Sequence, residues 1–86
     1  MEEKEYLLSE YPNPFDDAVQ LRLDNARNLN IGQVQVYDIT GRMLHVQNNI
    51  DNSRASIQLS GLVTGVYFIH VFLTNGETKI KRIFKQ

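Results

Sequence analysis

The stretch GVYFIHVFLTNGETKIKRIFKQ, residues 65–86, decides the fold of this chain. Two extended apolar runs flank Asn75-Gly76, a pair that favours a two-residue type I′ turn because both central residues take positive φ. We therefore predict an antiparallel hairpin whose second strand closes the sequence. Its register pairs Leu73 with Thr78, Val71 with Ile80, Ile69 with Arg82 and Tyr67 with Phe84.

The two-residue period of a strand divides the side chains of this hairpin between two faces. We expect the pairs named above to face the core. The opposite face then carries an apolar row that needs a cover of its own, either a partner, a second copy of the chain, or residues 6–8. The row consists of Phe68, Phe72 and Ile83. The same face carries Lys79, Lys81 and Lys85, a basic comb that either solvates a sheet edge or is presented to another molecule.

Length and composition limit the chain to one small domain. Its 86 residues bury only about three-fifths of the unfolded surface, which leaves little room for an enclosed active site. Hydrophobic residues make up 42% and charged residues 22%, the balance of a folded globular protein. The formal net charge of −1 gives no broad basic field, so nucleic acid is not an expected partner. Glutamates nevertheless gather at the start of the chain and basic residues at its end.

The absence of cysteine excludes a disulfide, a thiolate metal site and a cysteine nucleophile. No run approaches the roughly eighteen apolar residues of a membrane span. The opening MEEKE is not a secretory signal peptide, and Met1 precedes what resembles a mid-chain linker. We therefore expect a piece of a longer exported chain, with residues 1–10 as a linker and residues 11–86 as one domain.

Further strands precede the closing hairpin. Residues 18–23 alternate apolar and polar side chains, which favours a half-buried strand, although a helix over residues 17–28 is a rival interpretation. Residues 33–39 and 43–47 form a second predicted hairpin, and residues 55–59 alternate as another strand. Six or seven short strands without a convincing helix predict a small antiparallel β-sandwich.

The histidines, aspartates and serines of the chain lack the sequence neighbours that a metal site or a catalytic site requires. His45 and His70 fall on different predicted strands, with no carboxylate at ligand spacing. Asp16, Asp17 and Asp38 lie outside any D-x-D-x-D-G loop, and we expect them to cap turns. No serine lies in a G-x-S-x-G context, and no glycine-rich phosphate-binding motif is present. We therefore expect a non-catalytic domain without a metal or cofactor.

Several residues have conformational explanations at first reading. YPNPF, residues 11–15, must be extended or turned because its prolines fix φ and remove N–H donors. Gly41 and Gly65 indicate positive φ or a close approach of backbones. Tyr67 is expected to bury its ring while its hydroxyl finds a partner at the rim.

In order along the chain, YPNPF, VQVYDITGR, LSGLVTGVYFIHV and a lysine-rich ending resemble the C-terminal sorting domain of the type IX (Por) secretion system of Bacteroidota. The resemblance covers residues 11–86. Each short motif alone is common in proteins, so the resemblance depends on the order and spacing of the four motifs. The family's motif residues fall on Pro12, Asn13, Pro14, Asp38, Gly41, Arg42, Gly65, Tyr67, Lys79, Lys81, Arg82 and Lys85.

This resemblance implies an immunoglobulin-like sandwich of about seven strands, appended to a secreted cargo protein such as a protease, adhesin or glycosidase. It implies passage through the periplasm and across the outer membrane, recognition by an outer-membrane translocon, and removal by a sortase-like peptidase upstream of Tyr11. The cargo would then be secreted or stay at the cell surface. The alternative prediction is a fibronectin-like or carbohydrate-binding module of an extracellular enzyme, which the absence of tryptophan disfavours.

Overall fold

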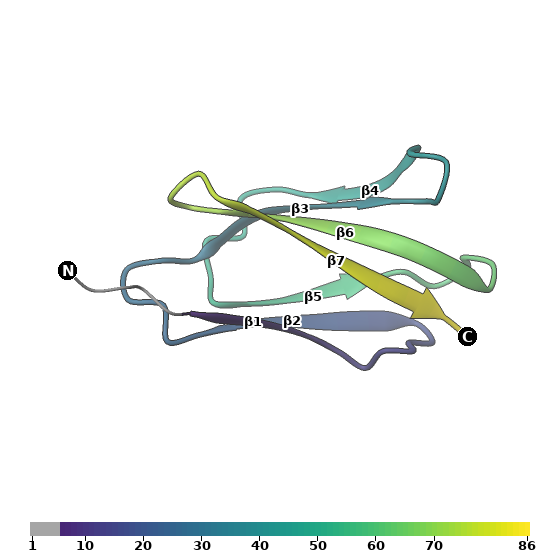
Figure 1. Cartoon of the computed structure of the whole chain (residues 1–86), viewed down its shortest axis with the longest axis horizontal. Coiled ribbons are helices and arrows are strands. Elements are labelled where there is room, and N and C mark those ends of the chain that lie inside the picture. The colour runs from purple at the N-terminus through teal and green to yellow at the C-terminus, as the bar shows by residue number, and fades with distance from the viewer. Residues whose placement is uncertain (1–5) are drawn as a thin grey trace.

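Every regular element in the computed structural model, which describes residues 6–86, is a β-strand. The strands are β1 (Leu7–Tyr11), β2 (Ala18–Asp24), β3 (Ile31–Tyr37), β4 (Met43–Gln47), β5 (Arg54–Gln58), β6 (Gly65–Leu73) and β7 (Thr78–Lys85). They form two antiparallel sheets, β1-β2-β5 and β4-β3-β6-β7, stacked as a sandwich (Figure 1). The predicted sandwich of about seven strands is confirmed, whereas an immunoglobulin-like topology stays a prediction. The rival helix over residues 17–28 is wrong, because β2 pairs with both β1 and β5.

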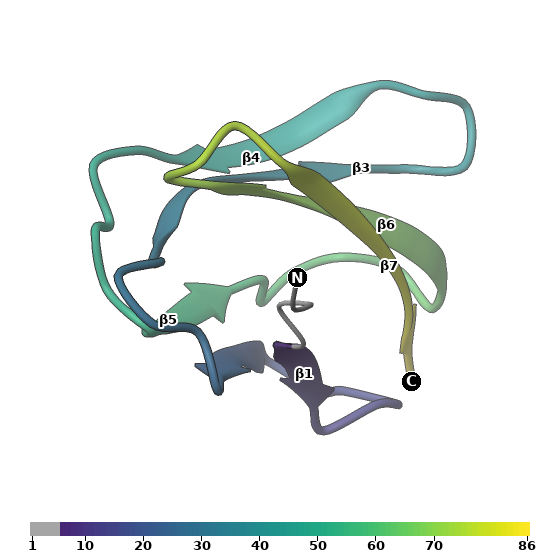
Figure 2. The ribbon, with the colours of Figure 1, turned by 60° about the vertical axis from the view of Figure 1, so that its left-hand side comes forward.

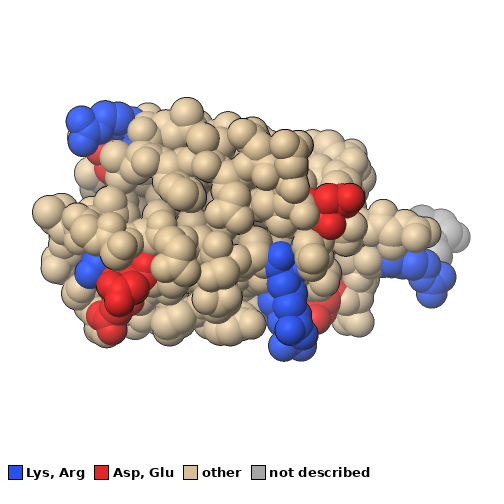
Figure 3. All heavy atoms as spheres, turned by 180° about the vertical axis from the view of Figure 1, so that it is seen from behind, with Lys and Arg blue, Asp and Glu red and all other residues tan. Residues whose placement is uncertain are grey.

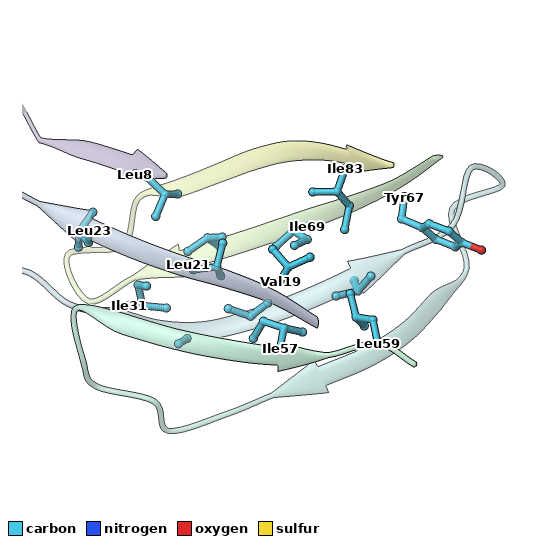
Figure 4. Packing of buried hydrophobic residues seen from close by; sticks show 14 of the residues in the cluster. Leu8, Val19, Leu21, Leu23, Ile31, Ile57, Leu59, Tyr67, Ile69 and Ile83 are labelled. Atoms are coloured by element: carbon cyan, nitrogen blue, oxygen red, sulfur yellow. The ribbon is translucent and has the colours of Figure 1, made fainter. Parts of the chain in front are cut away.

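The hydrophobic core lies between the two sheets and is built mainly from alternate residues of β2, β3, β5 and β6, with Leu8 from β1 and Ile83 from β7 (Figure 4). β2 turns Val19, Leu21 and Leu23 inward, as its alternation predicted. Phe15, in the loop between β1 and β2, is also fully buried. No polar or charged residue is buried within residues 6–86. Removal of apolar surface from water is therefore the main stabilising term.

The N-terminal strand belongs to the sandwich. Residues 7–10, which the sequence analysis assigned to a linker, form most of β1 and pair with β2 from Leu7↔Asp24 onward. Leu8 points into the core and is only 6% exposed. Residues 1–5 of the predicted linker lie outside the described part of the chain. No helix in residues 6–86 is long and apolar enough to cross a membrane.

The hairpin of β6 and β7 forms around a different turn from the one predicted. Gly76 takes a φ of 94°, but Asn75 is not among the residues with positive φ, so the turn is not type I′. The Gly76 N–H donates to the Leu73 carbonyl at 3.0 Å, and the Leu73 N–H donates to the Glu77 carbonyl at 2.8 Å. These bonds enclose a three-residue loop with a glycine in the left-handed region at its last position.

The longer loop moves the register of β7 by one residue. Tyr67 pairs with Ile83, whereas the sequence analysis paired it with Phe84. A slip of one residue moves every side chain of a strand to the other face. Ile83 therefore lies in the core, 1% exposed, and its predicted place in an outer row with Phe68 and Phe72 is wrong.

The same shift decides what each face of β7 presents. Lys79, Lys81 and Lys85 do share one face, as predicted, but it is the face of the core-facing Ile83. The outer face receives Ile80 and Phe84, which are 59% and 41% exposed. The lysines are thus directed toward the three-stranded sheet, and an apolar strip takes their predicted place.

We expect Ile69→Ala in the centre of β6 to destabilise the domain by about 2–5 kcal/mol, because it leaves a cavity in a packed core. Ile69 is 0% exposed. Ile80→Ala is the matched control, because the same deletion at a site 59% exposed removes little packing. Chemical denaturation of both variants measures the difference. Equal losses of stability would contradict the assigned register.

Candidate functional site

Three loops that are far apart in the sequence meet at one end of the sandwich. They join β1 to β2, β3 to β4 and β5 to β6, and the C-terminus reaches the same end (Figure 1). They contain or border the motif residues at positions 12–14, 38–42 and 65–67. The start of β1 and the β6–β7 turn lie at the opposite end (Figure 1). We call the end with the three loops the motif pole.

The β1–β2 loop holds the end of β7 through a set of hydrogen bonds. Asn13 Nδ2 donates to the Arg82 carbonyl at 3.1 Å, and the Phe84 N–H donates to Asn13 Oδ1 at 2.9 Å. The Phe15 N–H donates to the Phe84 carbonyl at 2.9 Å, and the Gln86 N–H donates to the Phe15 carbonyl at 3.0 Å. β7 slants from the four-stranded sheet toward this loop (Figure 2). The loop therefore occupies the free edge of β7 over its last residues.

Asp38 organises the β3–β4 loop, which confirms the prediction that it caps a turn. Its Oδ1 accepts the Thr40 hydroxyl at 2.6 Å, the Thr40 N–H at 2.9 Å and the Arg42 N–H at 3.0 Å. The Thr40 hydroxyl and then the Arg42 N–H hold the pKa of Asp38 below its ordinary value. Arg42 Nε lies 3.5 Å from Asp38 Oδ2. Gly41 has a φ of 92°, which side-chain-bearing residues rarely adopt.

Tyr67 connects the core to the β5–β6 loop. Its ring is buried, and its hydroxyl donates to the Val63 carbonyl at 2.7 Å, as predicted for an amphipathic aromatic residue. A cleft of about 410 Å³ separates this loop from the β3–β4 loop. Ile39 and Val63, which are 73% and 76% exposed, stand on its two sides. The motif pole therefore combines a cleft with two exposed aliphatic side chains.

The lysines of β7 engage the edge of the three-stranded sheet. Lys81 Nζ lies 3.6 Å from Glu10 Oε1 on β1, and Lys79 Nζ lies 5.2 Å from the centroid of the Tyr6 ring. The Tyr6 hydroxyl donates to Glu77. Burial, together with Glu77, raises the pKa of Tyr6 to about 12. The basic comb is therefore partly occupied by residues at the start of the chain.

The structure gathers some predicted site residues and separates others. Residues 12–14, 38–42, 65–67 and Lys85 lie at the motif pole, whereas Lys79 and Lys81 lie along β7 toward the other end. The analysis of the sequence missed Glu10 and Tyr6 as partners of the lysines. The uneven charge distribution of the chain was a signal that could have predicted this pairing, because opposite charges at the two termini attract.

No arrangement suited to catalysis or metal binding appears in residues 6–86. No group of three histidine, aspartate or glutamate residues there could hold a metal ion. His45 and His70 lie on β4 and β6, and the His70 ring contacts the Tyr37 ring with centroids 4.5 Å apart. On the side opposite that of Figure 1, charged side chains are scattered, mostly acidic beside basic (Figure 3).

Loops that a rigid β-sandwich holds together at one end are a common place for binding residues. The family model of the secretion system C-terminal sorting domain, of the Por secretion type, matches residues 9–86, so the chain belongs to that family. No curated protein matches the chain. The resemblance drawn from the motifs is thereby confirmed, and the domain is a non-catalytic secretion signal of the type IX system. This membership sets aside the alternative of a carbohydrate-binding module.

We expect Asn13→Ala to loosen the end of β7 and to cost about 1 kcal/mol, because two hydrogen bonds to the strand are lost. Hydrogen exchange of the Phe84 amide should speed up. Asn13→Asp is the graded control, since it keeps the acceptor for the Phe84 N–H and loses only the donor to Arg82. Unchanged exchange of the Phe84 amide in the Asn13→Ala protein would contradict the stabilising role of Asn13 at the end of β7.

We expect Asp38→Ala to destabilise the domain at neutral pH but not in strong acid. Because the folded-state pKa lies below the ordinary value of 3.8, the carboxylate's contribution is present above the unfolded pKa and is lost as pH falls through the folded pKa. Thermal unfolding of the wild type and of Asp38→Ala, from neutral pH to strong acid, measures the difference in stability. Asp16→Ala is the control, because it removes an exposed carboxylate of another loop. A wild-type advantage that persists into strong acid would argue against this role.

Proposed function

We propose that this domain directs an upstream cargo protein across the outer membrane, with an outer-membrane translocon recognising the motif pole and β7. A sortase-like peptidase then removes the domain, and the cargo stays at the cell surface or is released. The family match supports secretion by the type IX machinery. The observation that carries the finer proposal is that the start of β1 and the motif pole lie at opposite ends of the sandwich.

This separation of ends has a steric consequence. The cargo is joined before Tyr6, beside the β6–β7 turn, so it approaches the end of the sandwich away from the three motif loops. A recognition protein can then contact the motif pole while a folded cargo is attached. Recognition by shape needs such an accessible, preorganised surface.

The middle of β7 also supports recognition through the backbone. β7 pairs with β6 on one side only, and the β1–β2 loop covers its other edge from Arg82 onward. Alternation along the strand directs the backbone groups of Thr78 and Ile80 away from β6. This short open edge can accept an extended segment of a partner.

The position of β1 restricts where the peptidase acts. Leu7 to Tyr11 pair with β2, and Leu8 is buried, so this segment is not an accessible extended substrate. The proposed cleavage upstream of Tyr11 is therefore narrowed to the chain before Leu7. The dimer predicted through Phe68, Phe72 and Ile83 stays a prediction, with Ile83 removed from its surface by burial.

We expect deletion of residues 78–86 to abolish export of a reporter fused upstream of the domain, while the retained reporter stays active. The deletion removes the open edge of β7 and the core residue Ile83. The secreted fraction is measured in strains with and without the type IX translocon. Ser56→Ala, an exposed change on the outer side of β5, is the control and should export normally. If the truncated fusion still reached the medium through the translocon, the terminal strand would not be the signal.

A further inference from the structure

The outward faces of the two sheets differ sharply in chemistry. The three-stranded sheet turns polar and charged side chains outward from its β2 and β5 strands, among them Gln20, Arg22, Asp24, Arg54, Ser56 and Gln58. The four-stranded sheet turns out more apolar side chains. We call them the apolar outer face, and they are Tyr37, Met43, Val46, Val66, Phe68, Phe72, Ile80 and Phe84. Polar side chains lie among them on the same side, namely Gln33, Gln35, His70, Thr78 and Arg82. No described element covers this face.

An uncovered apolar sheet face of this kind marks a contact surface, because a solvated face of an antiparallel sheet is normally polar. Ile80, Met43, Val46 and Phe84 are between 41% and 59% exposed. Four strands at a spacing of ~4.8 Å, with a rise of ~3.3 Å per residue, give a footprint on the order of 500 Å². This approaches the roughly 800 Å² that each partner contributes to a standard protein interface.

The apolar outer face is continuous with the motif pole. Val66, Arg82 and Phe84 line a hollow of about 410 Å³ together with Asn13 and Pro14 of the β1–β2 loop. Val66 also borders the cleft between the other two motif loops. A molecule seated on the pole therefore meets the apolar outer face without a break.

The charge on the apolar outer face favours one kind of binding partner over another. Among the described residues it carries Arg82, opposite Phe68, and no carboxylate. A second copy of the chain would present the same surface without an acid, so Arg82 would find no counter-charge there. A partner whose apolar patch is bordered by a carboxylate would satisfy both the apolar area and Arg82.

We propose that the apolar outer face is a docking surface for the protein of the type IX machinery that recognises this domain. That protein offers an apolar patch with a carboxylate that pairs with Arg82. This inference rests on the proposed function and gives its recognition site a second part, which extends from the motif pole along β6 and β7.

Two variants with matched controls test the docking surface. Ile80→Lys and Arg82→Glu change the apolar outer face, whereas Leu7→Lys and Arg54→Glu make the same changes on the other sheet. Leu7 is 58% exposed and Ile80 is 59% exposed, and Arg54 and Arg82 are both exposed, so the two members of each pair should perturb folding to a similar degree. Thermal unfolding checks that all four proteins fold. We expect Ile80→Lys and Arg82→Glu to lower the exported fraction of the reporter about tenfold or more, and both controls to export normally.

The outcomes separate this inference from the proposed function. Normal export of Ile80→Lys and Arg82→Glu would overturn the docking surface, while loss of export on deletion of residues 78–86 would still uphold the sorting role. Light scattering of the isolated domain tests a second copy on this face. Flotation with phosphatidylglycerol vesicles tests a lipid surface. If Ile80→Lys abolished self-association or vesicle binding without changing export, the assignment to the secretion machinery would be wrong.

Discussion

The register of β7 against β6 determines what the terminal strand presents on each face. Gly76 occupies the left-handed region at the end of a three-residue loop, and this loop pairs Tyr67 with Ile83. Ile83 then completes the core, the lysines approach β1, and Ile80 and Phe84 reach the outer face. A register shifted by one residue would turn the lysines and Ile83 to the outer face. The core would then lose the hydrophobic stabilisation of a buried isoleucine.

The termini of the described chain stabilise one another across the open side of the sandwich. β1 and β7 are edge strands of different sheets and share no backbone ladder. Lys81 with Glu10 and Lys79 with Tyr6 close this side, and the β1–β2 loop bonds directly to the end of β7. Inward-directed charges and a covering loop are known protections of sheet edges against unwanted pairing. The protected strand therefore keeps only a short open edge, at Thr78 and Ile80.

A signal domain needs surfaces that remain accessible while another protein is attached to it. The sandwich meets this need because its strands run along the long axis and place the motif loops at the end opposite the start of β1. Asp38, Asn13 and Tyr67 each use side-chain hydrogen bonds to fix one loop of that end. The motif residues with the clearest structural explanation therefore act by shaping the pole. The apolar outer face lies next to this pole.

Alternation and turn residues in the sequence were sufficient to predict an all-β sandwich, the closing hairpin and the inward side of β2, because they depend on short-range periodicity. The order of the motifs was sufficient to predict the family. The sequence could not fix the register of β7, since Asn75-Gly76 fits both a two-residue turn and the observed loop, and packing of Ile83 against the core decides between them. Nor could it predict that the motif loops share one pole or that Asn13 binds β7. Such contacts join residues distant in the chain, and only the stacking of two sheets brings them together.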